Sequence, residues 1–180
     1  MRKNVEIEEK SKITKKQYDL LVNYYNLSNS IFIQDNYYFD TPNLDLLNQH
    51  ITLRIRKKPN SLKLTLKKKG DVGSIEQHLA INIDQFNDFI TNGINTSTYF
   101  NNLNYKVSFI TTLTTHRVAM LYEGGRIFLD KSIYNNTTDY EIEYEHNDVD
   151  ECKLNFNKFL DKHNIRYIPT TKKSYRALTC

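Results

Sequence analysis

Short segments in which apolar and charged residues alternate constrain the fold of this 180-residue chain more than any other feature. In residues 5–10, Val and Ile alternate with Glu6, Glu8 and Lys10. Successive side chains of a β-strand point to opposite faces, so each such segment predicts a strand with one apolar and one ionic face. The charged positions of the later segments are Arg54 and Arg56, then Lys63, Lys67 and Lys69, and finally Glu141, Glu143 and Glu145.

The ionic faces are sorted by sign, with carboxylates on the opening and late strands and cations on the two central ones. Arg117 and Arg126 add cations from a predicted hairpin. For any one strand, a solvent-facing ionic face is the simplest interpretation. Like charges at i and i+2 repel, however, and a surface selected for solubility alone would mix the signs. The alternative is a closed barrel with its ionic faces turned into a wet cavity, which would suit a polyanion bridged to a divalent metal.

Bulk composition fits one globular domain over residues 1–180, because 39% of residues are hydrophobic and 26% charged. A net charge of +4 tilts the protein toward anionic partners. Met1 leads directly into charged residues, and no stretch approaches the roughly 20 apolar residues that span a bilayer, so we expect a cytoplasmic protein without membrane contact. Cys152 and Cys180 are far apart and outside any metal-ligand spacing, so both are expected to be free thiols.

Strand and helix signals occur in an order typical of α+β proteins rather than of alternating βαβ units. The predicted strands are residues 5–10, 31–39, 52–57, 61–69, 75–83, 105–123, 127–129 and 140–145, with a hairpin turn at Gly124-Gly125. The predicted helices are residues 14–25 with a Thr14–Gln17 capping box, a helix capped by Asp84 that ends near Gly93, a helix from an Asp148–Glu151 capping box to about His163, and a short helix from Lys172.

Three motifs occur in order along the chain. Glu6 to Lys10 has the pattern ExExK, Tyr38 to Pro42 the pattern YxDTP, and Leu53 to Arg56 the pattern LRxR. In this order and spacing they resemble the motifs of the CYTH, or triphosphate tunnel, family. The resemblance continues to the C-terminal Lys173 and Arg176, and it implies an eight-stranded antiparallel tunnel barrel that grips a triphosphate.

The resemblance also implies roles for individual residues. Phosphate oxygens would be bound by Lys10, Arg54, Arg56, Lys63, Lys67, Arg117, Arg126, Lys173 and Arg176. Mg²⁺ or Mn²⁺ would be held by Glu6, Glu8, Glu76, Asp130, Glu141 and Glu143. Glu8, Lys10, Arg56 and Lys63 are the residues expected to be catalytic. His78 and Thr65 depart from the family pattern, and His78 is expected to be a hydrogen-bonded wall residue.

Three functions remain open at this point. Metal-dependent hydrolysis of tripolyphosphate, a nucleoside triphosphate or thiamine triphosphate is favoured. A cyclase that converts ATP to cyclic AMP and pyrophosphate needs a base pocket as well, and no residue set in the sequence indicates one. A noncatalytic binder of polyphosphate or nucleotides is the third. Nucleic acid is not expected as a partner, because its phosphates are met by cations without matching carboxylates. A monomer or a homodimer is expected.

Overall fold

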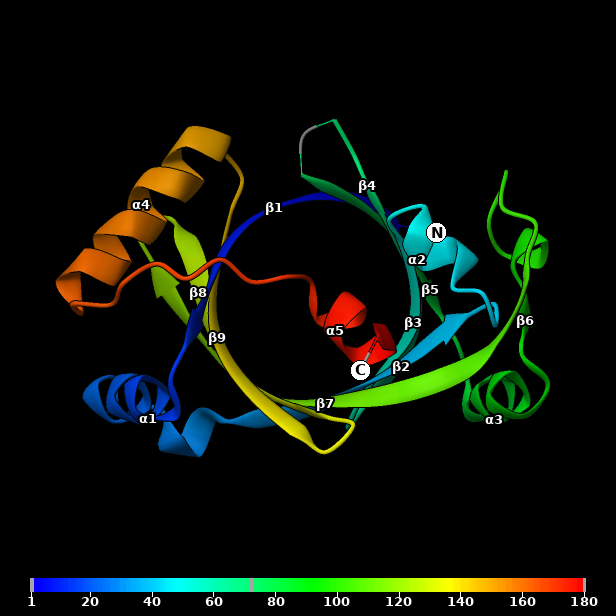
Figure 1. Ribbon diagram of the computed structural model, residues 1–180, viewed down its shortest axis with the longest axis horizontal. Helices are drawn as coiled ribbons and strands as arrows, with labels where there is room; N and C mark the ends of the chain where they lie inside the picture. The colour runs from blue at the N-terminus through cyan, green and yellow to red at the C-terminus, as the bar shows by residue number, and fades with distance from the viewer. Residues whose placement is uncertain (1, 72, 180) are drawn as a thin grey trace.

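The computed structural model, which describes residues 2–71 and 73–179, is a closed antiparallel β-barrel surrounded by helices (Figure 1). The strands are β1 (Arg2–Ile13), β2 (Phe32–Asp40), β3 (Ile51–Lys58), β4 (Ser61–Lys69), β5 (Ser74–Ala80), β6 (Ile94–Asn95), β7 (Lys106–Tyr122), β8 (Gly125–Tyr134) and β9 (Thr137–His146). Their hydrogen-bonded order is β2-β3-β4-β5-β1-β9-β8-β7-β6, and β2 also pairs with β7. Eight strands therefore form the ring, with β6 beside it, which confirms the predicted α+β barrel.

Strand β1 changes partner halfway along its length. Residues 2–6 pair with β5, and residues 7–13 pair with β9. Beyond Glu6, the edge of β1 that faced β5 is met instead by the C-terminal segment, where the Lys12 amide donates to the Ile168 carbonyl at 2.9 Å. The β4–β5 hairpin and β1 therefore diverge from Glu6 onward, next to the ionic face of β1.

The apolar faces of the strands point outward and are covered by helices, so the ionic faces point into the barrel. On one side, Phe159 of α4 (Val149–Lys162) and Leu21 of α1 (Lys15–Tyr24) pack in one core with Ile142 of β9. On the other side, Phe89 of α3 (Ile83–Asn92) packs in a second core with Leu64 of β4. This arrangement confirms the inward-facing alternative and excludes a solvent-facing ionic sheet.

The Asp-Thr-Pro turn after β2 is held by a buried carboxylate. Asp40 is 1% exposed and accepts backbone hydrogen bonds from Thr41 at 2.7 Å, Leu46 at 2.9 Å and Leu47 at 3.0 Å. These bonds satisfy amides at the start of α2 (Asp45–Asn48). Asp40 therefore has a structural role, since it fixes the route from β2 to β3.

Helix and turn signals were located correctly to within one or two residues. The Thr14–Gln17 capping box is present, but α3 is capped by Asn82 with Gln85, so the prediction of Asp84 was wrong. Asn82 has the extended backbone that an N-cap needs, whereas Asp84 lies inside the first turn.

Three further predictions need correction. The hairpin turn is formed by Glu123 and Gly124, both with positive φ, and Gly125 already belongs to β8. At the start of α4, Asp148 accepts from the Glu151 amide, but the Glu151 side chain accepts from Asn155 and leaves the capping box half formed. β5 also ends at Ala80 rather than at residue 83.

The C-terminal helix α5 (Lys173–Thr179) lies within the ring of strands when the barrel is viewed along its axis (Figure 1). Thr52 of β3 and Ser174 of α5 share a hydrogen bond of 3.0 Å that ties this helix to the barrel wall. Within the described ranges, no helix has the length and apolar character needed to cross a membrane.

Candidate functional site in the barrel interior

Charged side chains from most of the barrel strands and from the start of α5 surround a compartment in the barrel, here called the central compartment. Its free volume is about 70 Å³, room for about two water molecules while the side chains are paired with one another. Its cationic walls are Lys10, Arg54, Arg56, Lys67, Arg117, Lys172 and Lys173, and its carboxylates are Glu6, Glu8, Glu143 and Glu145. Glu76, Asp130 and Glu141 lie behind these walls and pair with some of the lining cations. An anionic ligand would therefore pair with the lining cations that have no carboxylate partner.

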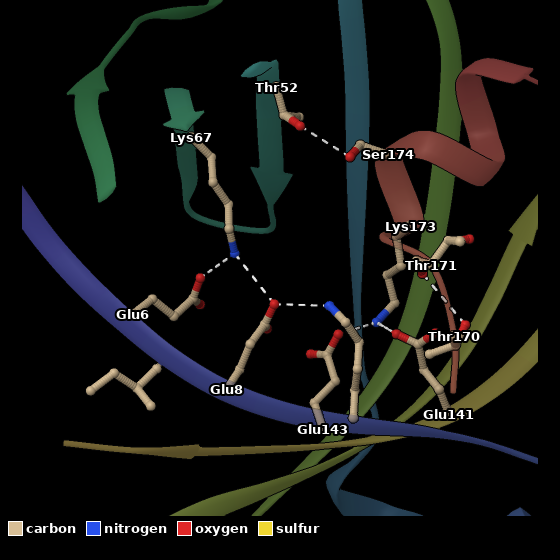
Figure 2. A network of polar contacts seen from close by, with 12 residues as sticks. Glu6, Glu8, Thr52, Lys67, Glu141, Glu143, Thr170, Thr171, Lys173 and Ser174 are labelled. Carbon is tan, nitrogen blue, oxygen red and sulfur yellow. Dashed lines mark hydrogen bonds and ion pairs between the residues drawn. The ribbon is translucent and has the colours of Figure 1, made fainter. Parts of the chain in front are cut away.

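A first carboxylate cluster consists of Glu6 and Glu8 on β1 and Glu145 on β9. Glu8 and Glu145 are directly paired across the two strands, which brings the three carboxylates together. Lys67 from β4 donates to Glu6 and lies 3.7 Å from Glu8, while Lys10 donates to Glu8 at 2.9 Å (Figure 2).

Crowding of like charges perturbs this first cluster. Burial and the charge of Glu6 raise the pKa of Glu145 to about 8, so the cluster retains a proton near neutral pH. Ligand oxygens of the three residues lie within 4.8 Å of one another. Carboxylate oxygens converging at this spacing suit a hard divalent cation such as Mg²⁺ or Mn²⁺.

A second carboxylate cluster consists of Asp130 on β8 and Glu141 and Glu143 on β9, and all three residues are buried. The Lys173 ammonium lies 2.7 Å from Asp130. It also lies 2.6 Å from Glu143 and donates to Glu141 (Figure 2). Arg117 donates to Asp130 through two nitrogens, at 2.8 Å and 2.5 Å, and also to Glu143. This cluster therefore already has cationic partners from the chain itself.

The pKa values in the second cluster reflect those partners. Burial alone would raise the pKa of Glu143, but Lys173 and Arg117 lower it well below the usual range. For Glu141, burial outweighs Lys173 and raises the pKa. Burial opposes the charge on Lys173, yet its pKa is raised by Asp130 and by the two glutamates. The lysine is therefore held charged inside the barrel.

Opposite the carboxylates, β3 presents a cationic wall. Arg54 lies 3.5 Å from Glu76, which is its acidic partner. Arg56 donates to the Asn36 side chain at 2.9 Å but, in the part of the chain that the structure describes, no carboxylate lies within 4.0 Å of it. Burial and repulsion from Arg54 and Arg117 lower the pKa of Arg56 to about 9. A half-buried cation without an anion costs free energy, so this position favours binding of an anion.

Most residues singled out from the sequence meet at this site. Lining the central compartment are Glu6, Glu8, Lys10, Arg54, Arg56, Lys67, Arg117, Glu143 and Lys173. Glu76, Asp130 and Glu141 form ion pairs with lining lysines. Arg176 lies further from the compartment and donates to Glu141 at 2.6 Å. Lys63 is exposed beside Arg56, and Arg126 is exposed in a separate cavity with Glu145, so neither lines the central compartment.

His78 and Thr65, the two residues that depart from the family pattern, contact each other. His78 shares a hydrogen bond of 3.0 Å with Thr65 through Nδ1, and its Nε2 lies 3.2 Å from Glu76. Burial lowers the pKa of His78, and Arg54 and Lys63 lower it further. His78 therefore lies in the barrel wall as a hydrogen-bonded residue, as predicted.

Several lining residues were not predicted as site residues. Glu145 continues the alternation of Glu141 and Glu143, and this signal could have identified it. The others are Gln34, Asn36, Tyr38, Thr52, Thr115, Lys172 and Ser174. Apart from Lys172, these residues are polar and uncharged. Such residues occur on many strands, so their types alone do not distinguish a tunnel wall from a surface.

Comparisons with known proteins agree with this geometry. The YjbK protein of Bacillus subtilis (strain 168), named as a candidate triphosphatase, is 32% identical over 98% of this chain and 95% of its own length. The crystal structure of a candidate adenylate cyclase from Bacillus halodurans superimposes with a TM-score of 0.87 at 27% identity, covering 98% of each chain.

A more distant structure shares the fold. HpAC1 from Hippeastrum, described as a candidate adenylyl cyclase with a dominant triphosphatase activity, has a TM-score of 0.72 at 21% identity, over 96% of this chain and 94% of its own. The CYTH domain model matches residues 4–178, which is almost the whole chain. The chain therefore belongs to the CYTH domain family.

Proposed function

We propose that the protein hydrolyses a phosphoanhydride bond of a triphosphate-bearing substrate in a reaction that depends on Mg²⁺ or Mn²⁺. The observation that carries this proposal is Arg56, a half-buried cation that lines the central compartment and has no carboxylate within 4.0 Å among the described residues. A triphosphate supplies the missing negative charge, and the facing carboxylates suit the metal that accompanies it. The names of YjbK and HpAC1 agree with hydrolysis.

The cationic wall is the proposed grip on the phosphates. Arg54, Arg56 and Arg117 present planar guanidinium groups that can bind two phosphate oxygens each. Lys10 and Lys67 are paired with Glu8 and Glu6 and would move to phosphate oxygens when substrate enters. Exposed Lys63 would act only at the outer end of the bound anion.

Glu6 and Glu8 are the proposed metal ligands, with Glu145 as a third that the sequence did not identify. When bound there, the metal neutralises charge on the phosphoryl group and its leaving oxygen. The carboxylates of the second cluster stay paired with cations of the chain, as does Glu76, which lies outside that cluster. The second cluster thereby orients Arg117 toward the central compartment. One carboxylate of the first cluster orients the attacking water and accepts a proton from it. The water oxygen bonds to phosphorus as the P–O bond to the leaving phosphate breaks.

Phosphate release by the purified protein tests this proposal. We expect orthophosphate from at least one of tripolyphosphate, ATP and thiamine triphosphate with Mg²⁺ or Mn²⁺, and none in EDTA. Glu8→Gln should reduce release by about 100-fold or more, because it removes a charged ligand from the metal. Glu9→Gln, on the opposite face of the same strand, is the matched control and should stay active.

The other outcomes of this assay separate the alternatives. Pyrophosphate with cyclic AMP from ATP, in place of orthophosphate, would identify a cyclase. Tight binding of all three compounds without turnover would identify a noncatalytic binder.

A pH dependence of metal binding is expected from Glu145. Its pKa is about 8 in the folded protein against an ordinary 4.5, so the folded state holds a proton that the unfolded chain releases. Stability of the metal-free protein should therefore fall as pH rises from about 4.5 to 8, and Mg²⁺ should stabilise it more at pH 8.5 than at pH 6.5. Thermal unfolding with and without Mg²⁺ measures both effects. Glu145→Gln should remove both; a variant with the wild-type pH profile would exclude Glu145 as the group responsible.

A further inference from the structure

A row of polar side chains crosses the barrel interior on four neighbouring strands. Gln34 of β2 is directly opposite Thr115 of β7. Thr115 is opposite Ser132 of β8, which in turn is opposite Asp139 of β9. The exposed fractions of these four residues are 2%, 0%, 0% and 7%, in the same order. The row is therefore buried inside the barrel, where polar atoms need hydrogen-bond partners from the protein or from a ligand.

Three of these four side chains have a buried oxygen atom without a hydrogen-bond partner. Within residues 2–71 and 73–179, these atoms are Oε1 of Gln34, Oγ1 of Thr115 and Oγ of Ser132. Asp139, by contrast, accepts from the Tyr134 hydroxyl. A buried polar atom without a partner destabilises a folded protein, so each such atom calls for a physical reason. Three of them in one row indicate polar groups whose partners the protein itself does not supply.

Two members of the row face the proposed substrate, because Gln34 and Thr115 line the central compartment. Arg117 is two positions after Thr115 on the same inward face of β7. Asn36 is two positions after Gln34 on β2, and its side chain accepts a hydrogen bond of 2.9 Å from Arg56. The amide and the hydroxyl therefore lie beside two guanidinium groups that we assign to phosphate binding.

Neutral donors suit this position better than further cations would. Repulsion from Arg54 and Arg117 already contributes to the lowered pKa of Arg56. A hydroxyl or a carboxamide donates a hydrogen bond without adding charge. A phosphate group held by two guanidinium groups still has oxygen lone pairs that accept such bonds. The Thr115 hydroxyl rotates freely about its C–O bond, and a half turn of the Gln34 carboxamide exchanges its oxygen for its NH₂ group.

We propose that Thr115 and Gln34 are substrate-binding residues that donate neutral hydrogen bonds to the phosphate group held by Arg56 and Arg117. This inference rests on the proposed triphosphate site and adds two uncharged residues to it. Without substrate, the Thr115 hydroxyl has no partner among the described residues. Removal of the hydroxyl should therefore weaken substrate binding without destabilising the substrate-free protein, whereas loss of a structural hydrogen bond would destabilise it.

Calorimetric titration of tripolyphosphate in EDTA, where a metal-dependent hydrolase does not turn over, tests these residues by binding alone. Thr115→Val keeps the shape of the side chain without its hydroxyl. It should weaken binding about tenfold, the loss typical of one hydrogen bond to a charged group. Its Tm should not fall, because the hydroxyl had no partner to lose. Gln34→Met should also weaken binding without a fall in Tm, and Thr115→Ser should bind like the wild type.

Ser132→Ala is the matched control for these variants. Ser132 also has a buried hydroxyl without a partner, but it does not line the central compartment in the part of the chain that the structure describes. Its replacement should likewise not lower the Tm, and it should leave the Kd for tripolyphosphate within about twofold of the wild-type value.

Three results would overturn the inference. One is wild-type affinity in both Thr115→Val and Gln34→Met, which would assign water as the partner of these groups. Another is weaker binding together with a lower Tm in both variants, as a structural role predicts. The third is a wild-type protein that binds no tripolyphosphate. Phosphate release decides the proposed function separately: weaker binding in Thr115→Val, with no phosphate released from any substrate, would support the neutral donors and contradict hydrolysis.

Discussion

Replacing Arg56 by alanine is expected to lower kcat/KM for the preferred triphosphate by about 100-fold to 1000-fold, the cost typical of removing one preorganised charge-stabilising donor. The guanidinium is half-buried, is oriented by a hydrogen bond of 2.9 Å to the Asn36 side chain, and has no carboxylate within 4.0 Å among the described residues. Its charge is therefore available to the substrate without first breaking an ion pair. Steady-state phosphate release with Mg²⁺, using tripolyphosphate and ATP, measures the effect.

Two companion variants make the Arg56 result specific. Arg56→Lys keeps a positive charge but loses the planar fork, so we expect activity between those of the wild type and Arg56→Ala. Arg166→Ala removes an exposed arginine from the segment after α4 and should leave kcat/KM unchanged. Arg56→Ala should not lose thermal stability, because it removes a half-buried cation that repels Arg54 and Arg117. Full activity in Arg56→Ala would show that phosphate is bound elsewhere.

The barrel could be predicted from the sequence because each strand segment shows, by itself, the alternation of apolar and charged residues and the sign of its charges. Arg54 and Arg56 alternate with apolar residues of the outer core, and Glu141 and Glu143 do the same on β9. A strand covered by helices on its apolar face has only the barrel interior left for its charges. Local alternation was therefore enough to place most charged residues inside.

Features that depend on contacts between distant segments could not be predicted in this way. The change of partner along β1 depends on where β5 and β9 pair with it, and it leaves no signal in residues 5–10. The short helix α5 lies inside the barrel because Lys173 reaches three buried carboxylates, which belong to strands far earlier in the chain. The spacing of residues in the sequence gives no information on contacts of this kind between distant segments.

The ion pairs of Lys173 also change how the second carboxylate cluster is interpreted. From the sequence, Asp130, Glu141 and Glu143 were expected to hold metal. In the structure Lys173 contacts all three of these residues. Lys67 and Lys10 contact only Glu6 and Glu8 of the first cluster, and among the described residues Glu145 has no cation within 4.0 Å. The first cluster on β1 and β9 is therefore the better candidate for the metal. Carboxylate types and spacing alone cannot distinguish a metal site from a buried lysine site, because both need the same oxygens.

Loss of the Lys173 charge should therefore destabilise the protein by about 3–5 kcal/mol, the cost typical of breaking a buried ion pair from one side. Lys173→Met keeps the side-chain volume and leaves the three carboxylates without their ammonium. Because the pKa of Lys173 is raised by folding, its contribution is fully present at neutral pH. In the variant, the carboxylates should instead take up protons, so the loss of stability should be larger at pH 8 than at pH 5. Denaturant unfolding at both pH values measures this difference.

Added Mn²⁺ distinguishes the role of Lys173 from simple loss of packing. If the Lys173 ammonium balances the charge of the three carboxylates, a metal ion can take its place in Lys173→Met. Mn²⁺ should then raise the Tm of Lys173→Met more than that of the wild type. Lys153→Met changes an exposed lysine of α4 and should alter neither the stability nor the response to Mn²⁺. Wild-type stability in Lys173→Met at pH 8 would show that the ammonium does not hold the second cluster together, and the metal would then have to be assigned again between the two clusters.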